Sequence, residues 1–252
     1  MRRLATALIY TLSAGLGAAA FAYPFLAAVA GKGSSSPPNV VLLTTVLVAL
    51  SLAALLIEVQ GQAVSAKVVS ALGVLVAVAA VLRFVETAVP GPGGFSPLFA
   101  PIILVGYVFD ARLGFLMGTM TMLVSALITG GVGPWLPYQM FAAGWVGLTA
   151  GWLPRPRSPR WQLVLLAGFG FGWGLLFGAL LNLYSWPLVG GAGDQSLPLH
   201  QLLARYGVYY LSTSLVWDLM RALGNAALIL VLGAPAVRAL TRFRNRFQFQ
   251  VE

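Results

Sequence analysis

Long uncharged stretches alternate with short polar segments along this 252-residue chain, a pattern that predicts a helical membrane protein. An apolar helix needs about 20 residues to cross the hydrocarbon core of a bilayer. Backbone N–H and C=O groups find no water there, so continuous apolar runs predict helices and not loops. The apolar runs predict eight transmembrane helices, at residues 4–29, 39–57, 68–88, 98–109, 113–129, 138–153, 161–184 and 209–232.

The segments between these runs are rich in glycine, proline, serine and charged residues, which favour turns. They read GKGSSSPP at residues 31–38, PGPGGFSP at 90–97, GGVGPWLP at 130–137 and PRPRSPR at 154–160. Asp110-Ala111-Arg112 predicts a tight polar turn. Residues 185–206 predict a long connection before the last helix.

Composition supports the membrane interpretation and narrows the function classes. Hydrophobic residues make up 59% of the chain and charged residues only 8%, whereas soluble domains carry about 25% charged residues. The absence of cysteine excludes disulfides and thiolate nucleophiles. The net charge of +9 does not indicate nucleic-acid binding, because the basic residues lie between apolar runs and at the chain ends.

The basic residues also predict an orientation. With the N terminus in the cytoplasm, eleven Lys and Arg residues fall on that side, and only Lys32 and Arg205 fall outside. Cytoplasmic loops carry an excess of Lys and Arg, so both termini are expected in the cytoplasm. A signal peptide ending at Ala20-Phe21-Ala22 is the alternative for the first segment and would leave seven helices. The apolar run that continues to Val29 favours a membrane helix.

Four charged residues are expected inside or near the helices, where they are costly. Arg83 and Glu86 are three residues apart, and so are Asp218 and Arg221, so each pair shares a helix face. With a helix start at Tyr209, Asp218 is expected on the order of 14 Å below the outer end. Each pair either neutralises itself and joins two helices, or forms the polar floor of an outward-facing ligand cavity.

Aromatic side chains gather on the predicted outer side, more than an interfacial belt requires, and indicate an aromatic-lined pocket there. The candidate substrate-binding residues are Arg83, Glu86, Trp135, Tyr138, Gln139, Asn182, Tyr184, Trp186, Tyr210, Asp218 and Arg221. Small residues at three- or four-residue spacing mark close helix contacts, either internal or with another subunit. These candidates are Ala66, Ser70, Gly73, Ala77 and Ala80, with Gly168, Gly172, Gly174 and Gly178 forming a second series.

The sequence contains no recognisable motif for catalysis, and we expect no catalytic residues, metal site or cofactor. His200 is the single histidine and has no carboxylate partners at ligand spacing. The sequence Gly31-Lys32-Gly33-Ser34 lacks the upstream glycine of a phosphate-binding loop and has no Ser or Thr directly after the lysine. ATP-driven transport would therefore need a separate ATPase chain.

From Lys67 onward the chain resembles the substrate-binding (S) component of energy-coupling factor (ECF) vitamin transporters. The resemblance lies in ALGVLVAVAAVLRFVE, in the block from PLFAPIILVGYVFD to WVGLTAG, and in WDLMRALGNAALIL, and it covers residues 65–240. The middle block, with GPWLPYQM as its most specific part, is most similar to members associated with cobalamin or corrinoid uptake.

The resemblance implies an all-α integral membrane protein of the prokaryotic plasma membrane. A six-helix substrate-binding core with a basic cytoplasmic tail, residues 65–252, would follow a two-helix extension, residues 1–64. The core would hold a vitamin in an outward-facing cavity formed by the loops at 90–97, 130–137 and 185–206. It would associate with a transmembrane coupling subunit and two ATPase subunits. Family members dock through an AxxxA face on the first core helix, whose nearest matches here are Ala66-xxx-Ser70 and Gly73-xxx-Ala77.

Two other function classes remain open from the residues alone. A self-sufficient secondary transporter or channel for a small organic solute would predict paired inverted repeats with interrupted helices. No convincing repeat relates residues 1–126 to residues 127–252. A structural or assembly protein of the membrane would use the small-residue stripes and would need no polar cavity.

Overall fold

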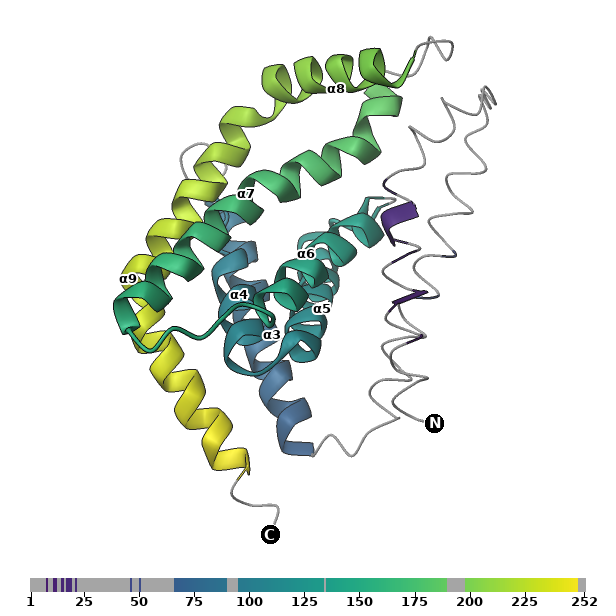
Figure 1. Ribbon diagram of the computed structural model, residues 1–252. Coiled ribbons are helices and arrows are strands. Elements are labelled where there is room, and N and C mark those ends of the chain that lie inside the picture. Colours follow the sequence, from purple (N-terminus) through teal and green to yellow (C-terminus); the bar gives the residue numbers. More distant parts are fainter. Residues whose placement is uncertain are drawn as a thin grey trace.

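The computed structural model describes residues 66–89, 95–133, 135–189 and 198–248, together with single positions in the first 65 residues. The predicted helices at 4–29 and 39–57 lie outside the described ranges. Within those ranges the chain forms seven helices and no strand (Figure 1). They are α3 (Ala66–Ala88), α4 (Phe99–Val108), α5 (Ala111–Thr129), α6 (Leu136–Ala150), α7 (Pro159–Val189), α8 (Leu199–Thr213) and α9 (Leu215–Gln248).

Helices α3 to α6 lie within a few residues of their predicted positions, with one difference at the turn before α5. Only Phe109 and Asp110 separate α4 from α5, and the Asp110 carboxylate accepts a hydrogen bond from the Leu113 N–H at 2.7 Å and caps α5. Ala111 and Arg112 are already helical. An aspartate at an N-cap satisfies one of the unpaired N–H groups of the first turn, which explains the early start.

The C-terminal third differs more from the prediction. The expected connection at 185–206 is shorter, because α7 continues to Val189 and α8 begins at Leu199. The expected single helix at 209–232 is divided at Ser214, the C-cap of α8. Helix α9 then continues through the basic segment to Gln248, since Leu240 and Phe243 pack toward the core there.

Four of the described helices are long and apolar enough to cross a bilayer. Their candidate spans are Ser70–Ala88, Ala111–Thr129, Pro159–Leu183 and Leu215–Arg246. Helix α4 is equally apolar but has only 10 residues.

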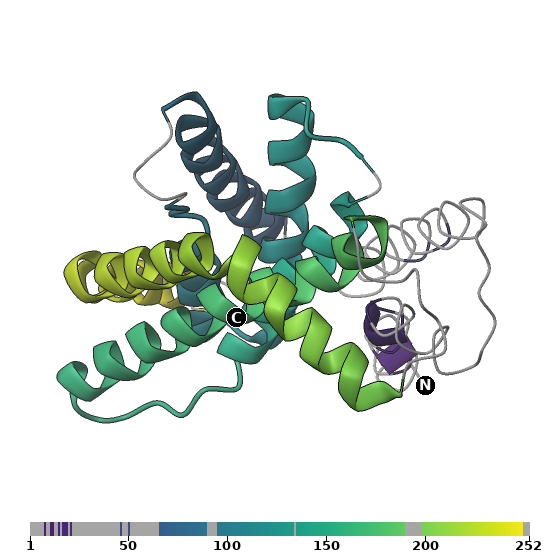
Figure 2. The same cartoon turned by 90° about the horizontal axis from the view of Figure 1, so that it is seen from above.

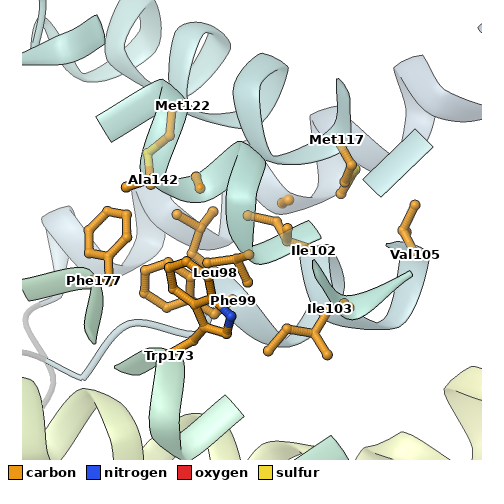
Figure 3. Packing of buried hydrophobic residues seen from close by; sticks show 14 of the residues in the cluster. Leu98, Phe99, Ile102, Ile103, Val105, Met117, Met122, Ala142, Trp173 and Phe177 are labelled. Atoms are coloured by element: carbon orange, nitrogen blue, oxygen red, sulfur yellow. The ribbon is translucent and has the colours of Figure 1, made fainter. Parts of the chain in front are cut away.

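Helix α4 occupies the centre of the bundle, with nine of its ten residues buried. It contacts α5, α6, α7 and α9. Leu98, Phe99, Ile102 and Ile103 lie at the centre of the apolar cluster in Figure 3. Around them are Met117 and Met122 of α5, Ala142 of α6, and Trp173 and Phe177 of α7. A helix that is apolar on every side is stable only when it is surrounded in this way.

Glycines allow the backbones of α5 and α6 to touch. A Cβ atom added at Gly147 would lie 1.9 Å from the carbonyl oxygen of Gly114. One added at Gly118 would lie 2.0 Å from the carbonyl oxygen of Ala143. Such close approach gives van der Waals contacts between the helices. These contacts matter because the hydrophobic effect does little to drive helices together in lipid.

Glycines also join α7 to α9, although in a different register from the predicted series. Gly170, Gly174 and Gly178 repeat every four residues and pack against Ile229, Ala222 and Asp218, respectively. Gly168 and Gly172 face away from the bundle, where an added Cβ atom would meet nothing within 4 Å. The predicted series Gly168, Gly172, Gly174 and Gly178 therefore divides between two faces of α7.

The bundle has two chemically different ends. At one end α8 runs from near the end of α7 to the start of α9 (Figures 1 and 2). Residues 95–98 and 130–133 lie at this same end, because the chain reverses direction from each helix to the next between α3 and α6. We call it the α8 end. The opposite, basic end contains the C terminus of α4, the segment at 151–161 and the C-terminal turns of α9.

We predict that Gly147→Ala lowers the free energy of unfolding by about 1–3 kcal/mol, because the added methyl group overlaps the backbone of α5. Thermal unfolding of the purified protein in detergent measures this change. Gly172→Ala is the matched control and should leave the melting temperature unchanged or raise it. Equal melting temperatures for the two variants would contradict the close contact between α5 and α6.

Candidate ligand-binding site

The structure brings the two predicted charged pairs into one group at the α8 end. Arg221 Nη1 donates to Asp218 Oδ1 in a salt bridge on α9. Arg83 and Glu86 interact electrostatically on α3, and each of them also interacts with Arg221. The guanidinium group of Arg221 lies over the ring of Phe177, 5.6 Å from its centroid. The four side chains supply two positive and two negative charges, so the group is balanced.

Asp218 lies closer to the helix end than the sequence suggested. The expected depth, on the order of 14 Å, assumed one continuous helix from Tyr209. Because the chain breaks at Ser214, Asp218 instead lies in the first turn of α9. The charged group is therefore placed near the end of the bundle, and not near the middle of α9.

Asn225 connects α9 to the segment that precedes α4. Its side-chain amide is fully buried, donates to the Ser96 carbonyl at 2.9 Å and accepts from the Ala100 N–H at 3.0 Å. Ser96 in turn donates from its hydroxyl to Glu86 Oε2 at 2.8 Å. This chain of hydrogen bonds holds α3, α4 and α9 together beside the charged group. Asn225 is not among the candidate binding residues from the sequence, although it lies four residues after Arg221 and so continues the spacing of Asp218 and Arg221. No sequence signal indicates its partner in the glycine- and proline-rich loop.

One acceptor and one donor in this region have no partner among the described residues. Asp218 is only 2% exposed, and its carboxylate interacts with Arg221 and with the Tyr210 hydroxyl. Its Oδ2 atom, however, has no partner in regular hydrogen-bond geometry within the described part of the chain. The same is true of the Asn182 Nδ2 donor on α7. Asp218 packs against Gly178, and Asn182 lies one turn further along the same face of α7. Both groups therefore face the α7–α9 interface near the charged group.

Tyrosines of α8 close over this interface. The Tyr206 hydroxyl donates to the Ala179 carbonyl, and the Tyr210 hydroxyl donates to the Leu175 carbonyl at 3.5 Å. Tyr209 and Ser185 share a hydrogen bond of 3.3 Å. Burial raises the pKa of Tyr206, and burial, together with nearby Asp218, raises the pKa of Tyr210 to about 12. These hydroxyls therefore remain protonated donors at neutral pH.

The other aromatic candidates divide into two groups. Trp186 is buried and packs edge-on against Tyr206 at a ring-centroid distance of 5.7 Å, so it belongs with the α8 tyrosines. The side chain of Tyr184 lies outside the described residues. Trp135 is exposed and donates from Nε1 to the Gly131 carbonyl at 3.2 Å. Tyr138 is buried edge-on against Phe21 at 5.1 Å, and Gln139 follows it, half-buried.

The small residues of α3 also divide by exposure. Ser70, Gly73 and Ala77 lie on the exposed face, and a Cβ atom added at Gly73 would meet nothing within 4 Å. Ala80 is fully buried and packs inside the bundle. The side chain of Ala66 lies outside the described residues.

The long apolar helices indicate a multi-pass membrane protein, with the buried polar group near its α8 end. No cluster of His, Asp or Glu able to hold a metal ion occurs among the described residues. A family model for the substrate-specific component of ECF transporters matches residues 67–233, about two thirds of the chain. The chain belongs to this family. No curated protein and no solved structure matched it.

Membership confirms the resemblance found in the sequence at the level of the family. S components are the substrate-binding subunits of membrane transporters and not enzymes. The family also implies association with coupling and ATPase subunits and a vitamin-type substrate.

We predict that Arg221→Gln lowers the free energy of unfolding by about 3 kcal/mol, because it leaves the buried Asp218 carboxylate without its counter-ion. Unfolding in detergent measures the loss. The double variant Asp218→Asn/Arg221→Gln removes both charges and should recover most of the lost stability. A double variant no more stable than the single one would show that the loss does not come from the uncompensated charge of Asp218.

Proposed function

We propose that this protein captures a vitamin that presents neutral polar groups at the α8 end and passes it to a coupling subunit powered by two ATPases. The favoured ligand is cobalamin or a related corrinoid. The proposal combines family membership with the polar residues between α7 and α9. It takes Arg83, Glu86, Asn182, Trp186, Tyr210, Asp218 and Arg221 as the main binding group.

The observation that carries the proposal is the unpartnered pair, Asp218 Oδ2 and Asn182 Nδ2. A buried acceptor and a buried donor without partners cost free energy, and a ligand that offers the complementary groups recovers it. A primary carboxamide offers both, since its NH₂ group donates and its carbonyl oxygen accepts. Corrinoids carry several carboxamides at their periphery, which favours them over vitamins that bear a carboxylate.

The balance of charge supports a ligand that presents neutral groups to this cluster. Asp218 is paired with Arg221, and Glu86 interacts with Arg83. An ionised ligand group would have to displace one of these partners, which leaves a buried charge uncompensated. Neutral polar groups need no such exchange.

Helix α8 supplies a cover for the ligand. Its contacts with α7 include the tyrosine hydrogen bonds and the packing of Trp186 against Tyr206. The N-terminal part of α6 lies at the same end. In this proposal it forms a second wall of the ligand site, through Trp135, Tyr138 and Gln139. Mobile covers over a binding site are commonly held by a few contacts of this kind.

In this proposal the α8 end faces outward and the basic end faces the cytoplasm, with both termini on the cytoplasmic side. Residues 65–252 form the substrate-binding core, and residues 1–64 form a two-helix extension. Phe21 supports a packed extension, because its ring contacts Tyr138 and Trp145 of α6 at centroid distances of 5.1 and 5.6 Å.

We predict that Asn182→Leu weakens cyanocobalamin binding about fivefold, because one hydrogen bond from the protein to the ligand is lost. The melting temperature without ligand should stay the same or rise, because an unpartnered buried donor is removed. Equilibrium dialysis of the purified full chain measures affinity. Trp135→Ala tests the second wall and should also weaken binding.

Exposed Asn245 on α9 offers a matched control, and Asn245→Leu should change neither affinity nor melting temperature. Wild-type affinity in Asn182→Leu would remove this residue from the site. Failure of the wild-type chain to bind cyanocobalamin would overturn the corrinoid assignment.

We further propose that the exposed face of α3 docks on the coupling subunit through Ser70, Gly73 and Ala77. We predict that Gly73→Leu/Ala77→Leu prevents copurification with the coupling subunit while ligand affinity is retained. Bulky side chains there would separate helices that small residues bring together. Gly168→Leu/Gly172→Leu adds the same bulk on the exposed face of α7 and should leave assembly intact. Loss of ligand binding in the α3 variant would indicate internal packing instead.

A further inference from the structure

The basic end carries a concentration of arginines that the binding function does not use. In the described ranges it contains Arg112, Arg155, Arg157, Arg160, Arg238, Arg242, Arg244 and Arg246. The acidic residue described at this end is Asp110, whose carboxylate caps α5. The α8 end, in contrast, has balanced charges around Asp218 and Arg221.

Two of these arginines have internal roles. Arg155 Nη2 donates to the Tyr107 carbonyl at 3.1 Å, and Arg244 Nη1 donates to the Val108 carbonyl at 2.7 Å. They satisfy carbonyl groups at the C-terminal end of α4, where helical partners are missing. Cations at this position also interact favourably with the helix dipole. The remaining arginines are not needed for this purpose.

Five arginines form an exposed surface. Arg238, Arg242 and Arg246 repeat every four residues on one face of α9, opposite the packed side chains of Leu240 and Phe243. Arg157 and Arg160 lie where α7 begins, and α7 runs antiparallel to α9 from this point. An added Cβ atom at Gly233 would lie 2.9 Å from Leu163, so the start of α7 lies beside the α9 segment near Arg238. Within the described residues none of the five has an acidic partner.

Two tryptophans locate this surface relative to the bilayer. Trp152 and Trp161 flank the segment with Arg157 and Arg160, and they are 68% and 67% exposed. The candidate span of α7 begins at Pro159, between the two. Exposed tryptophans at the end of an apolar span lie at the level of lipid headgroups. The arginines beside them are therefore at the level of the phosphates.

We propose that Arg157, Arg160, Arg238 and Arg242 bind the headgroups of anionic phospholipids around the basic end. Guanidinium groups match phosphate oxygens in geometry as well as in charge. The exposed tryptophans favour lipid over an acidic protein surface as the partner. Arg246 lies further along α9, beyond the headgroup level, and contributes less. This proposal is independent of the ligand bound at the α8 end.

The test uses the full chain, purified in dodecyl maltoside and supplied with equal amounts of palmitoyl-oleoyl phosphatidylglycerol and phosphatidylcholine. Native mass spectrometry counts the lipid retained, and the melting temperature is followed in parallel. The wild type should retain the anionic lipid about tenfold over the zwitterionic one, since several arginines act near the surface. Inorganic phosphate at the same concentration should not raise the melting temperature, which separates a lipid headgroup from a free anion.

Arg157→Gln/Arg160→Gln/Arg238→Gln/Arg242→Gln should lose most of this preference. Arg205→Gln, an exposed arginine on α8 at the other end, should keep it. If the fourfold variant does not fold, quenching of the wild-type tryptophans by brominated phosphatidylglycerol, and not by brominated phosphatidylcholine, gives the same information. Equal retention or quenching by the two lipids would overturn the proposal. The proposal would also be overturned if the variant with all four substitutions kept its lipid preference but failed to assemble with the coupling subunit, because the surface would then bind a protein.

Discussion

The terminal N–H and C=O groups of the short helix α4 need hydrogen-bond partners, and the residues that supply them connect the other helices to α4. Helix α4 is buried in the centre of the bundle, where backbone groups without partners are costly. At its N-terminal end, Asn225 accepts from the Ala100 N–H. At its C-terminal end, Arg155 and Arg244 donate to the last carbonyls. Helix α9 supplies a partner at each end, so its position along α4 is fixed.

This arrangement separates two kinds of chemistry along α9. Near Asn225 the helix carries Asp218 and Arg221, which pair with each other beside α7 and close to the charged residues of α3. Near Arg244 it carries exposed arginines at the edge of the apolar surface. Glycines keep the intervening helices in direct contact, as at Gly174 against Ala222. A rigid centre can thus support a balanced polar site at one end and a positive surface at the other.

The positions of most helices could be predicted from the apolar runs, because the length of a membrane helix and its lack of charged residues can be read from the local sequence. The division at Ser214 could not, since residues 209–217 contain no proline, glycine or charged residue to mark a break. The pairing of Asp218 with Arg221 followed from spacing, but the contact of Glu86 with Ser96 depends on a loop that spacing cannot place. The glycine register on α7 was similarly decided by its neighbour α9 and not by the glycine sequence itself.

The most direct test of the central claim is a structure of the chain with cyanocobalamin bound. The account predicts ligand density between α7 and α9 beneath α8, with a carboxamide within hydrogen-bonding distance of Asp218 Oδ2 and Asn182 Nδ2. Bound ligand elsewhere, with these two atoms still buried and unpartnered, would contradict it.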